Sequence, residues 1–170
     1  MTGSLSIGGL AGNNTGEIDK CYATGNITGL SNAGGIAGSN YTAGGKITSC
    51  VALNNRIRLN STSASSIGRI VGAFDAGVLS GNRARKDMVF QIISVSTTNI
   101  ETGTATNKNG ENIATPFSSS IYTTRWWNFS TFLGGMGYSS TLWDIASGRL
   151  PRLKTAPDGG AFNQDQNPAI

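Results

Sequence analysis

Short apolar runs separated by glycine recur along the first half of the chain. One phrase occurs three times, as Ile7-Gly8-Gly9-Leu10-Ala11-Gly12, Ala33-Gly34-Gly35-Ile36-Ala37-Gly38 and Ile67-Gly68-Arg69-Ile70-Val71-Gly72. A period of roughly 26 to 34 residues is typical of a solenoid or another repeat array. The pattern therefore predicts three copies of one structural unit within residues 1–98.

After each phrase, apolar positions alternate with polar ones in the manner of short strands. The inward set that we expect is Ile18, Cys21, Ala23 and Ile27 in the first copy, Ile47, Cys50, Ala52, Ile57 and Leu59 in the second, and Leu79, Asn82, Ala84, Met88 and Phe90 in the third. The three-residue step from Ile18 to Cys21 predicts a bulge or a corner. Ile27, Ile57 and Met88 take equivalent places, so stacked units would form ladders of apolar side chains.

The repeats favour an all-β fold, a right-handed parallel β-helix in which each unit makes one coil. Coils of such a solenoid stack about 4.8 Å apart, and each pairs with the coils above and below it. Glycine pairs suit its corners, because glycine permits positive φ and a close approach of neighbouring backbones. The alternative is a β-sandwich in which the glycine pairs only mark turns.

Three further segments follow the repeats. Residues 99–121 are polar and predict a loop with a hairpin-like turn at Asn109-Gly110. Residues 122–154 hold most of the aromatic side chains, and we expect them to form a C-terminal cap, because the end of a solenoid exposes core and strand edges. Residues 155–170 are polar, contain Pro157 and Pro168, and predict a linker or tail.

The composition narrows the classes of function. Charged residues make up 13% of the 170 residues, the formal net charge is +4, and the sequence has no histidine. The positive charge is mild, and the sequence has no dense stripe of Lys and Arg such as a nucleic-acid-binding protein carries. Because histidine is absent, the chain also lacks the commonest metal ligand and the commonest side chain for acid–base catalysis near neutral pH. No apolar run is long enough to predict a membrane span. We therefore expect no cofactor, no metal, no catalytic residue and no nucleic-acid partner.

The glycine phrase and the half that follows it resemble the GLUG repeat. The resemblance rests on Gly-Gly-Leu-Ala-Gly at residues 8–12 and Gly-Gly-Ile-Ala-Gly at residues 34–38, each followed by a half of the form Gly-x-Ile-x-x-Cys-x-Ala. A closing segment with Trp143, Ile145, Gly148, Pro151 and Leu153 supports it. The third copy departs from the pattern, because Arg69 replaces the second glycine and Asn82 replaces the cysteine.

This resemblance implies a setting for the protein. GLUG repeats occur in secreted bacterial adhesin-like proteins and in the non-catalytic regions of IgA1-type metallopeptidases. The resemblance thus implies an extracellular or cell-surface location, and a longer parent chain with further repeats or domains.

Cys21, Cys50 and Asn82 occupy one aligned position of the repeat. Adjacent coils would place the two thiols side by side, either as a disulfide or as buried free thiols that pack as small apolar groups. Like-facing neighbours on parallel strands rarely suit the disulfide dihedral, which favours free thiols. Asn82 requires backbone hydrogen bonds if it is buried, and the alternative is a local bulge that turns it outward.

Basic side chains recur late in the second and third copies. Arg56 and Arg58 alternate with apolar residues, and we expect them to share one lateral face with the later cations, which are Arg83, Arg85 and Lys86. Such a face could bind an anionic glycan or a protein on a host or cell surface. The alternative is a solvated edge whose charges resist aggregation.

Aromatic residues offer a second candidate site. Tyr122, Trp126 and Trp127 could stack against sugar rings, because their faces are flat and their neighbours polar. The alternative is that these rings only cover the end of the core, where aromatic side chains bury a large area.

Three functions are compatible with these features. The one we expect is a non-enzymatic extracellular module that acts in adhesion or as a stiff display stalk. The second is a structural spacer of a larger secreted protease or toxin. The third is a polysaccharide-active β-helix enzyme, but glycoside hydrolysis usually needs two carboxylates facing one cleft, whereas Asp19 aligns with Thr48 and Ser80.

Overall fold

The computed structural model describes residues 5–60, 66–93, 95–99, 103–113, 123–128 and 135–154. The chain divides into two compact units, Met1–Thr115 and Pro116–Ala169. The first unit is a parallel β-solenoid of about three turns, so the predicted all-β repeat fold is confirmed. The predicted linker or tail at residues 155–170 lies outside the described residues.

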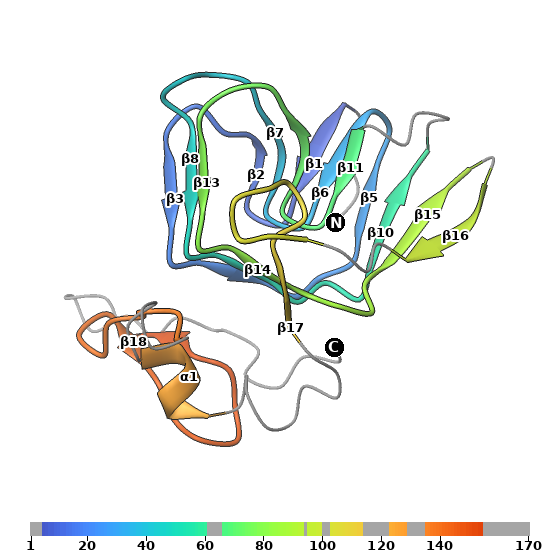
Figure 1. Ribbon diagram of the computed structural model, residues 1–170. Helices are drawn as coiled ribbons and strands as arrows, with labels where there is room; N and C mark the ends of the chain where they lie inside the picture. Colours follow the sequence, from blue (N-terminus) through green and yellow to red (C-terminus); the bar gives the residue numbers. More distant parts are fainter. Residues whose placement is uncertain are drawn as a thin grey trace. The chain divides into compact units, whose positions relative to one another are not determined.

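Each repeat forms one coil of five short strands (Figure 1). The first coil consists of β1 (Ser6–Gly8), β2 (Ala11–Asn13), β3 (Glu17–Asp19), β4 (Tyr22–Ala23) and β5 (Ile27–Gly29). The second consists of β6 (Asn32–Gly34), β7 (Ala37–Asn40), β8 (Lys46–Thr48), β9 (Val51–Ala52) and β10 (Arg56–Leu59). The third consists of β11 (Ile67–Gly68), β12 (Val71–Phe74), β13 (Val78–Ser80), β14 (Arg83–Arg85) and β15 (Val89–Ile92).

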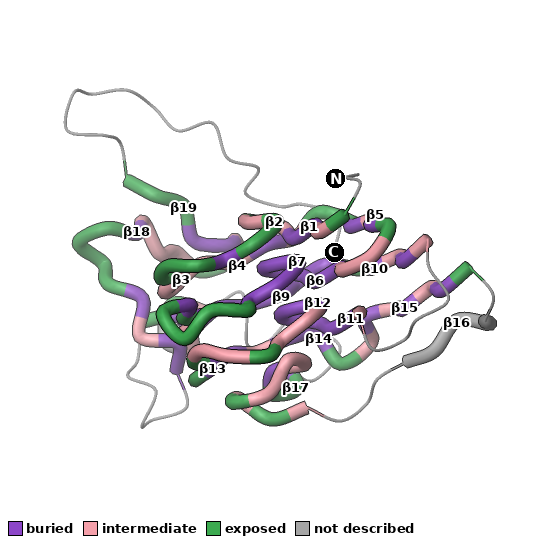
Figure 2. The backbone as a smooth tube through the Cα atoms, turned by 90° about the horizontal axis from the view of Figure 1, so that it is seen from above, coloured by how far each residue is buried: buried purple, intermediate pink, exposed green. Residues whose placement is uncertain are grey.

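Equivalent strands of successive coils pair in parallel and give five sheets that run along the stack. The middle coil is covered on both sides, and Figure 2 shows its strands β7 and β9 as buried. At the open end of the stack, β2 keeps no fully buried residue. Burial therefore follows the position of a coil in the stack.

The predicted ladders form, with one exception. Ile18, Ile47 and Leu79 are cross-strand partners, as are Ala23, Ala52 and Ala84.

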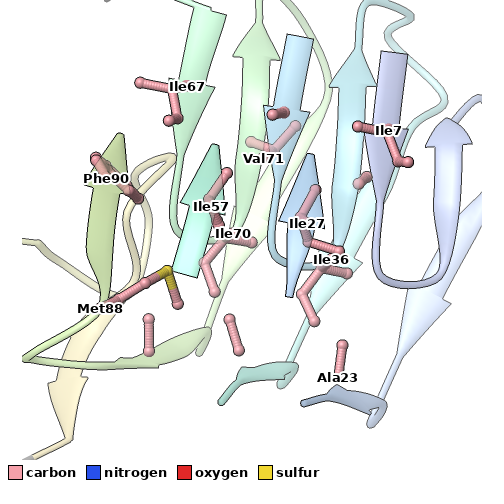
Figure 3. Packing of buried hydrophobic residues seen from close by; sticks show 14 of the residues in the cluster. Ile7, Ala23, Ile27, Ile36, Ile57, Ile67, Ile70, Val71, Met88 and Phe90 are labelled. Carbon is pink, nitrogen blue, oxygen red and sulfur yellow. The ribbon is translucent and has the colours of Figure 1, made fainter. Parts of the chain in front are cut away.

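The prediction that Met88 continues the ladder of Ile27 and Ile57 is wrong, because Phe90 is the partner of Ile57. The interval between the alanine ladder and this ladder grows by one residue in each coil, from Ala23 to Ile27, from Ala52 to Ile57 and from Ala84 to Phe90, which moves the register. Met88 is nevertheless fully buried, and Figure 3 shows it in the core beside Ile57 and Phe90.

The glycine phrase makes an inward U-turn in each coil. Figure 1 shows β1 and β2 lying between β3 on one side and β5 on the other. The two inner sheets are in backbone contact: a Cβ atom placed on Gly34 would lie 2.1 Å from the carbonyl oxygen of Ala37 and 2.6 Å from the backbone nitrogen of Gly72. Only glycine permits this approach, so the repeated glycines set the distance between the inner sheets.

A second repeated feature is the corner that the step from Ile18 to Cys21 predicts. The residue before each cysteine position has a positive φ, at 49° for Lys20, 50° for Ser49 and 63° for Gly81. The corner is therefore confirmed as a left-handed residue between two strands, repeated in all three coils.

Residues 103–113 continue along the third coil. The backbone nitrogens of Ile70 and Val71 donate to the carbonyl oxygen of Lys108, and β17 (Glu111–Ile113) pairs in parallel with β14. Gly110 has a φ of 67° in the predicted Asn-Gly turn, but this turn leads into a parallel strand and joins no hairpin. On the neighbouring sheet, β16 (Val95–Asn99) pairs antiparallel with β15.

Arg69, which breaks the glycine phrase, is fully buried beneath this segment. Its guanidinium donates to three carbonyl oxygens, at 2.9 Å to Asn109, 2.8 Å to Gly110 and 3.2 Å to Arg85. Burial lowers the pKa of Arg69 to about 10. The third copy thus departs from the repeat pattern at the residue that holds the last segment of the solenoid in place.

The second unit contains α1 (Thr124–Asn128) and a hairpin of β18 (Trp143–Asp144) and β19 (Arg152–Leu153). Trp126, Trp127, Tyr138 and Trp143 form an aromatic cluster, in which successive ring centroids lie 4.8, 4.8 and 5.1 Å apart. The closing motif therefore forms a hairpin that joins this cluster through Trp143.

Candidate ligand-binding surface

Arg56 and Arg58 lie on β10, the middle strand between β5 and β15. Side chains alternate along a strand, and Ile57 and Leu59 are fully buried, so the two arginines face away from the core. Arg56 is exposed and Arg58 is half-buried. In the register, Thr28 of β5 and Gln91 of β15 flank Arg58 on the same face.

The other predicted cations lie elsewhere. Arg83 and Arg85 belong to β14, whose parallel partners are β9 and β17, so they lie on a different sheet from β10. Arg85 is buried, with an exposed fraction of 5%, and its guanidinium pairs with Asp87 at 2.7 Å. The expectation that the five cations share one face is therefore wrong, because a corner separates the strand of Arg83 from the position that pairs with Arg56.

The cations of this second group are also engaged differently. Arg83 pairs with Glu111 at 3.4 Å. The hydrogen bonds from Arg85 lower the pKa of Asp87. Lys86 is exposed at the corner after β14. The predicted basic set therefore divides between two strands, with Arg56 and Arg58 on β10 and with Arg83 and Arg85 on β14, where both pair with carboxylates.

The aromatic candidates are divided by burial. Trp127 is fully buried, whereas Trp126 is partly exposed and meets it edge to face. Tyr122 lies outside the described residues. A buried ring cannot stack against a sugar, so Trp127 contributes to packing and Trp126 alone of the described pair keeps an accessible face.

The aligned thiols are free, and Asn82 continues their ladder. Cys50 is fully buried, Cys21 partly so, and each thiol donates to the carbonyl oxygen two residues before it, at 3.2 Å. Hydrogen bonding to Cys21 and burial raise the pKa of the Cys50 thiol. Asn82 is buried and inward, donates to the carbonyl oxygen of Ile47 at 2.7 Å and accepts from the Cys50 backbone nitrogen at 3.0 Å. Its predicted backbone partners are therefore confirmed.

The predicted alignment of Asp19 with Thr48 and Ser80 is also confirmed, because the three residues are cross-strand partners. Partial burial acts to raise the pKa of Asp19, but hydrogen bonds from Lys20 and Thr48 outweigh it and lower the pKa. Thr48 donates to the carboxylate at 2.6 Å. This single carboxylate is therefore held ionised within the ladder.

One feature of the β10 face escapes the sequence pattern. The Nε atom of Arg58 and the Oδ1 atom of Asn60 are buried and have no hydrogen-bond partner among the described residues. Asn60 lies two residues after Arg58 and so continues the outward series of Arg56 and Arg58. The alternation could have placed Asn60 on this face, but its unpaired oxygen depends on the folded structure.

Two features are absent from the described part of the chain. No helix there is long and apolar enough to cross a membrane. Within the same residues, no three side chains of histidine, cysteine, aspartate or glutamate gather where they could hold a metal ion.

The stacked coils and repeated corners define the class of the protein as a parallel β-solenoid built from sequence repeats. A family model, described as the GLUG motif, matches residues 3–28, which hold the first coil except for its last residue, Gly29. The first coil therefore carries a GLUG motif, and the chain is similar in this part to GLUG-motif repeat proteins. No curated protein and no solved structure matches the chain.

Proposed function

We propose that this chain is a non-enzymatic extracellular repeat module of a bacterial surface or secreted protein, acting in adhesion or as a stiff display stalk. The observation that supports the proposal best is the in-register stacking of three coils into five parallel sheets. Each coil adds length along the axis and a strip of lateral surface without needing a reaction centre.

The close contact of the inner sheets favours a stiff stack. Gly38 and Gly72 bring backbone against backbone, since a Cβ atom on Gly38 would lie 2.4 Å from the Ile7 nitrogen. Bending the stack would separate these sheets as well as the ladders between coils. This arrangement supports the proposal of a stalk that presents its lateral faces at a fixed orientation.

The alternatives predict different behaviour. A spacer of a larger secreted protease or toxin would hold other domains apart and bind nothing through its own faces. A polysaccharide-active enzyme is the weaker alternative, because Asp19 is engaged by Lys20 and Thr48 and its ladder continues with uncharged side chains.

The test is attachment. Beads coated with the folded chain are placed on immobilised bacterial and host-cell surfaces under flow, beside beads coated with the heat-unfolded chain. We expect attachment that requires the folded chain and leaves the surface polysaccharide chemically unchanged. Equal retention of both bead types would contradict adhesion and leave the spacer as the better account, whereas release of reducing sugar would indicate the enzyme.

A further inference from the structure

Arg56 and Arg58 differ from the other arginines whose side chains the structure describes. Arg69 donates to three carbonyl oxygens, and the remaining four pair with carboxylates: Arg83 with Glu111, Arg85 with Asp87, and Arg149 and Arg152 both with Asp144. Within the described residues, the guanidinium groups of Arg56 and Arg58 have no such partner. The β10 face therefore carries two charges that the fold does not neutralise.

The neighbouring strands supply no compensation. The sequences of β5, β10 and β15 are Ile-Thr-Gly, Arg-Ile-Arg-Leu and Val-Phe-Gln-Ile, without an acidic residue. Arg56 and Arg58 stand about 6.6 to 6.8 Å apart along one face, as alternate residues of a strand do. Two like charges at this distance raise the free energy of the folded state, and a bound anion would lower it.

The polar atoms beside the charges restrict the ligand further. The unpaired Nε of Arg58 is a donor and calls for an anionic or carbonyl oxygen, while the unpaired Oδ1 of Asn60 is an acceptor and calls for a hydroxyl or amide hydrogen. A buried polar atom without a hydrogen-bond partner destabilises the folded state, so a ligand that pairs both atoms gains binding free energy. Both side chains are only partly buried, so a small rotation of either brings the unpaired atom to the surface.

We propose that the outer face of β10 binds an acidic polysaccharide, with carboxylate groups on Arg56 and Arg58 and sugar hydroxyls on Asn60. Thr28 and Gln91, which flank Arg58 in the register, add hydroxyl and amide groups on either side. This assignment rests on the proposed adhesive function and names its ligand class.

The observations favour a polysaccharide over a nucleic acid. The aromatic side chain of these strands, Phe90, is buried with an exposed fraction of 1% and offers no face for stacking against a base. Two arginines also cover far fewer phosphates than the roughly six to ten contacts that give duplex DNA binding its steep salt dependence. Alternating cations and uncharged hydrogen-bonding groups suit a ligand that alternates carboxylates with hydroxyls.

The experiment measures binding of an oligogalacturonate to the purified chain by calorimetry, at about 50 mM and about 300 mM NaCl. The test variant is Arg56→Ala with Arg58→Ala. The matched control is Lys46→Ala with Lys86→Ala, which removes the same charge from two exposed residues on other strands or corners. Neutral dextran and duplex DNA are the comparison ligands, and circular dichroism checks that each variant is folded.

We expect the test variant to bind the oligogalacturonate at least about tenfold more weakly, because each charge-assisted hydrogen bond contributes about 1.5 to 3 kcal/mol. The control should stay within about twofold of the unaltered chain. A third variant, Asn60→Asp, should weaken binding as strongly, because its carboxylate would occupy Arg58.

Other results overturn the assignment in distinguishable ways. Binding that survives in the folded test variant places the ligand elsewhere and leaves adhesion intact. If the control variant binds the oligogalacturonate as weakly as the test variant, binding depends only on the net charge of the chain and not on the β10 face. If the chain binds duplex DNA more tightly than the oligogalacturonate, the ligand is a nucleic acid and not an acidic polysaccharide. Bead attachment without oligogalacturonate binding refutes this ligand alone, whereas loss of bead attachment refutes the proposed function.

Discussion

At the residue scale, the corners of the solenoid place side chains in a backbone conformation that raises the free energy of the folded state. Lys20 and Ser49 occupy the left-handed region that Gly81 adopts in the third coil. This region costs a non-glycine residue about 1 to 2 kcal/mol. The first two coils carry that cost, which shows that the corner is imposed by the ladder and not by local preference.

Gly81→Ala should therefore lower the free energy of unfolding by about 1 kcal/mol. The control is Gly25→Ala, because a Cβ atom on Gly25 meets no atom within 4 Å and its φ is not positive. Urea unfolding followed by circular dichroism measures both variants. Equal stability of the two would show that the corner relaxes to accept a side chain.

Arg69 gives a prediction about the end of the stack. Arg69→Met removes the donor to the carbonyl oxygens of Asn109, Gly110 and Arg85 and should cost roughly 2 kcal/mol. Hydrogen exchange should quicken at the amides that pair with residues 103–113, which include Ile70 and Asn82. Unchanged exchange at these amides would mean that Arg69 does not hold the segment.

The pair of Arg85 and Asp87 gives a pH prediction. Hydrogen bonds from Arg85 lower the pKa of Asp87 in the folded state, so the pair contributes stability above about pH 4, and this contribution is lost as the pH falls through the folded-state pKa. Asp87→Asn should reduce the stability at pH 6 and flatten its decline between pH 5 and about pH 2.5. The measurement is the free energy of unfolding as a function of pH for the unaltered chain and for Asp87→Asn. Curves of equal slope would show that the pair of Arg85 and Asp87 contributes nothing to the pH dependence.

At the element scale, the inner U-turn depends on the absence of side chains. A Cβ atom on Gly34 would meet backbone atoms of Ala37, Val71 and Gly72 at 2.1 to 2.8 Å. No rotamer change relieves a clash with backbone, so the inner sheets would have to separate.

Gly34→Ala should therefore cost about 3 kcal/mol or more, at the upper end of what overpacking costs. Gly16→Ala is the matched control, since a Cβ atom there meets nothing within 4 Å. Thermal unfolding midpoints compare the two. A folded Gly34→Ala protein of ordinary stability would contradict the backbone contact between the inner sheets.

At this scale the sequence pattern predicts the features that recur in every coil and does not predict those that differ between coils. The ladders of Ile18, Ile47 and Leu79 follow from alternation, and they formed. The prediction for Met88 is wrong because the interval from Ala84 to this ladder is longer than in the other coils, which puts Phe90 opposite Ile57. The lengths of such intervals do not repeat, so the sequence pattern does not predict them. The prediction that the arginines share one face is wrong because a corner lies between β14 and β15. Arg83 precedes that corner, whereas Arg56 follows the equivalent corner of its own coil, so the two residues lie on different sheets.

Arg69 shows a different limit of sequence reasoning. Its place in the glycine phrase marks it only as a departure from the repeat. Its partners, Asn109 and Gly110, lie about 40 residues further on, in a segment whose polar composition predicts a loop. Long-range pairing of this kind leaves no local pattern.

At the scale of the whole molecule, the coils should differ in stability although their sequences are alike. The strands of the middle coil pair on both sides, while β1 to β5 are the edge strands of their sheets. In a stack of nearest-neighbour contacts, an end coil opens more easily than an internal one.

Amide exchange should therefore be slowest in the middle coil, by about 100-fold relative to the first coil. Val51 and Leu53, whose amides donate to the first coil at 2.9 and 2.8 Å, are suitable probes. Mass spectrometry of peptides from each coil measures the difference. Uniform protection across the three coils would indicate that the stack opens as a single unit.

The two ends of the solenoid also differ in what they allow. Among the described strands, none pairs with the outer edge of the first coil, whereas in the third coil Arg69 stands where the first two copies have their second glycine. Arg69 therefore breaks the glycine pattern in the coil that residues 103–113 cover, through its hydrogen bonds to Asn109 and Gly110. The least regular repeat is thus the one at which the stack passes from coils of similar sequence to a segment that has no counterpart in the other two coils.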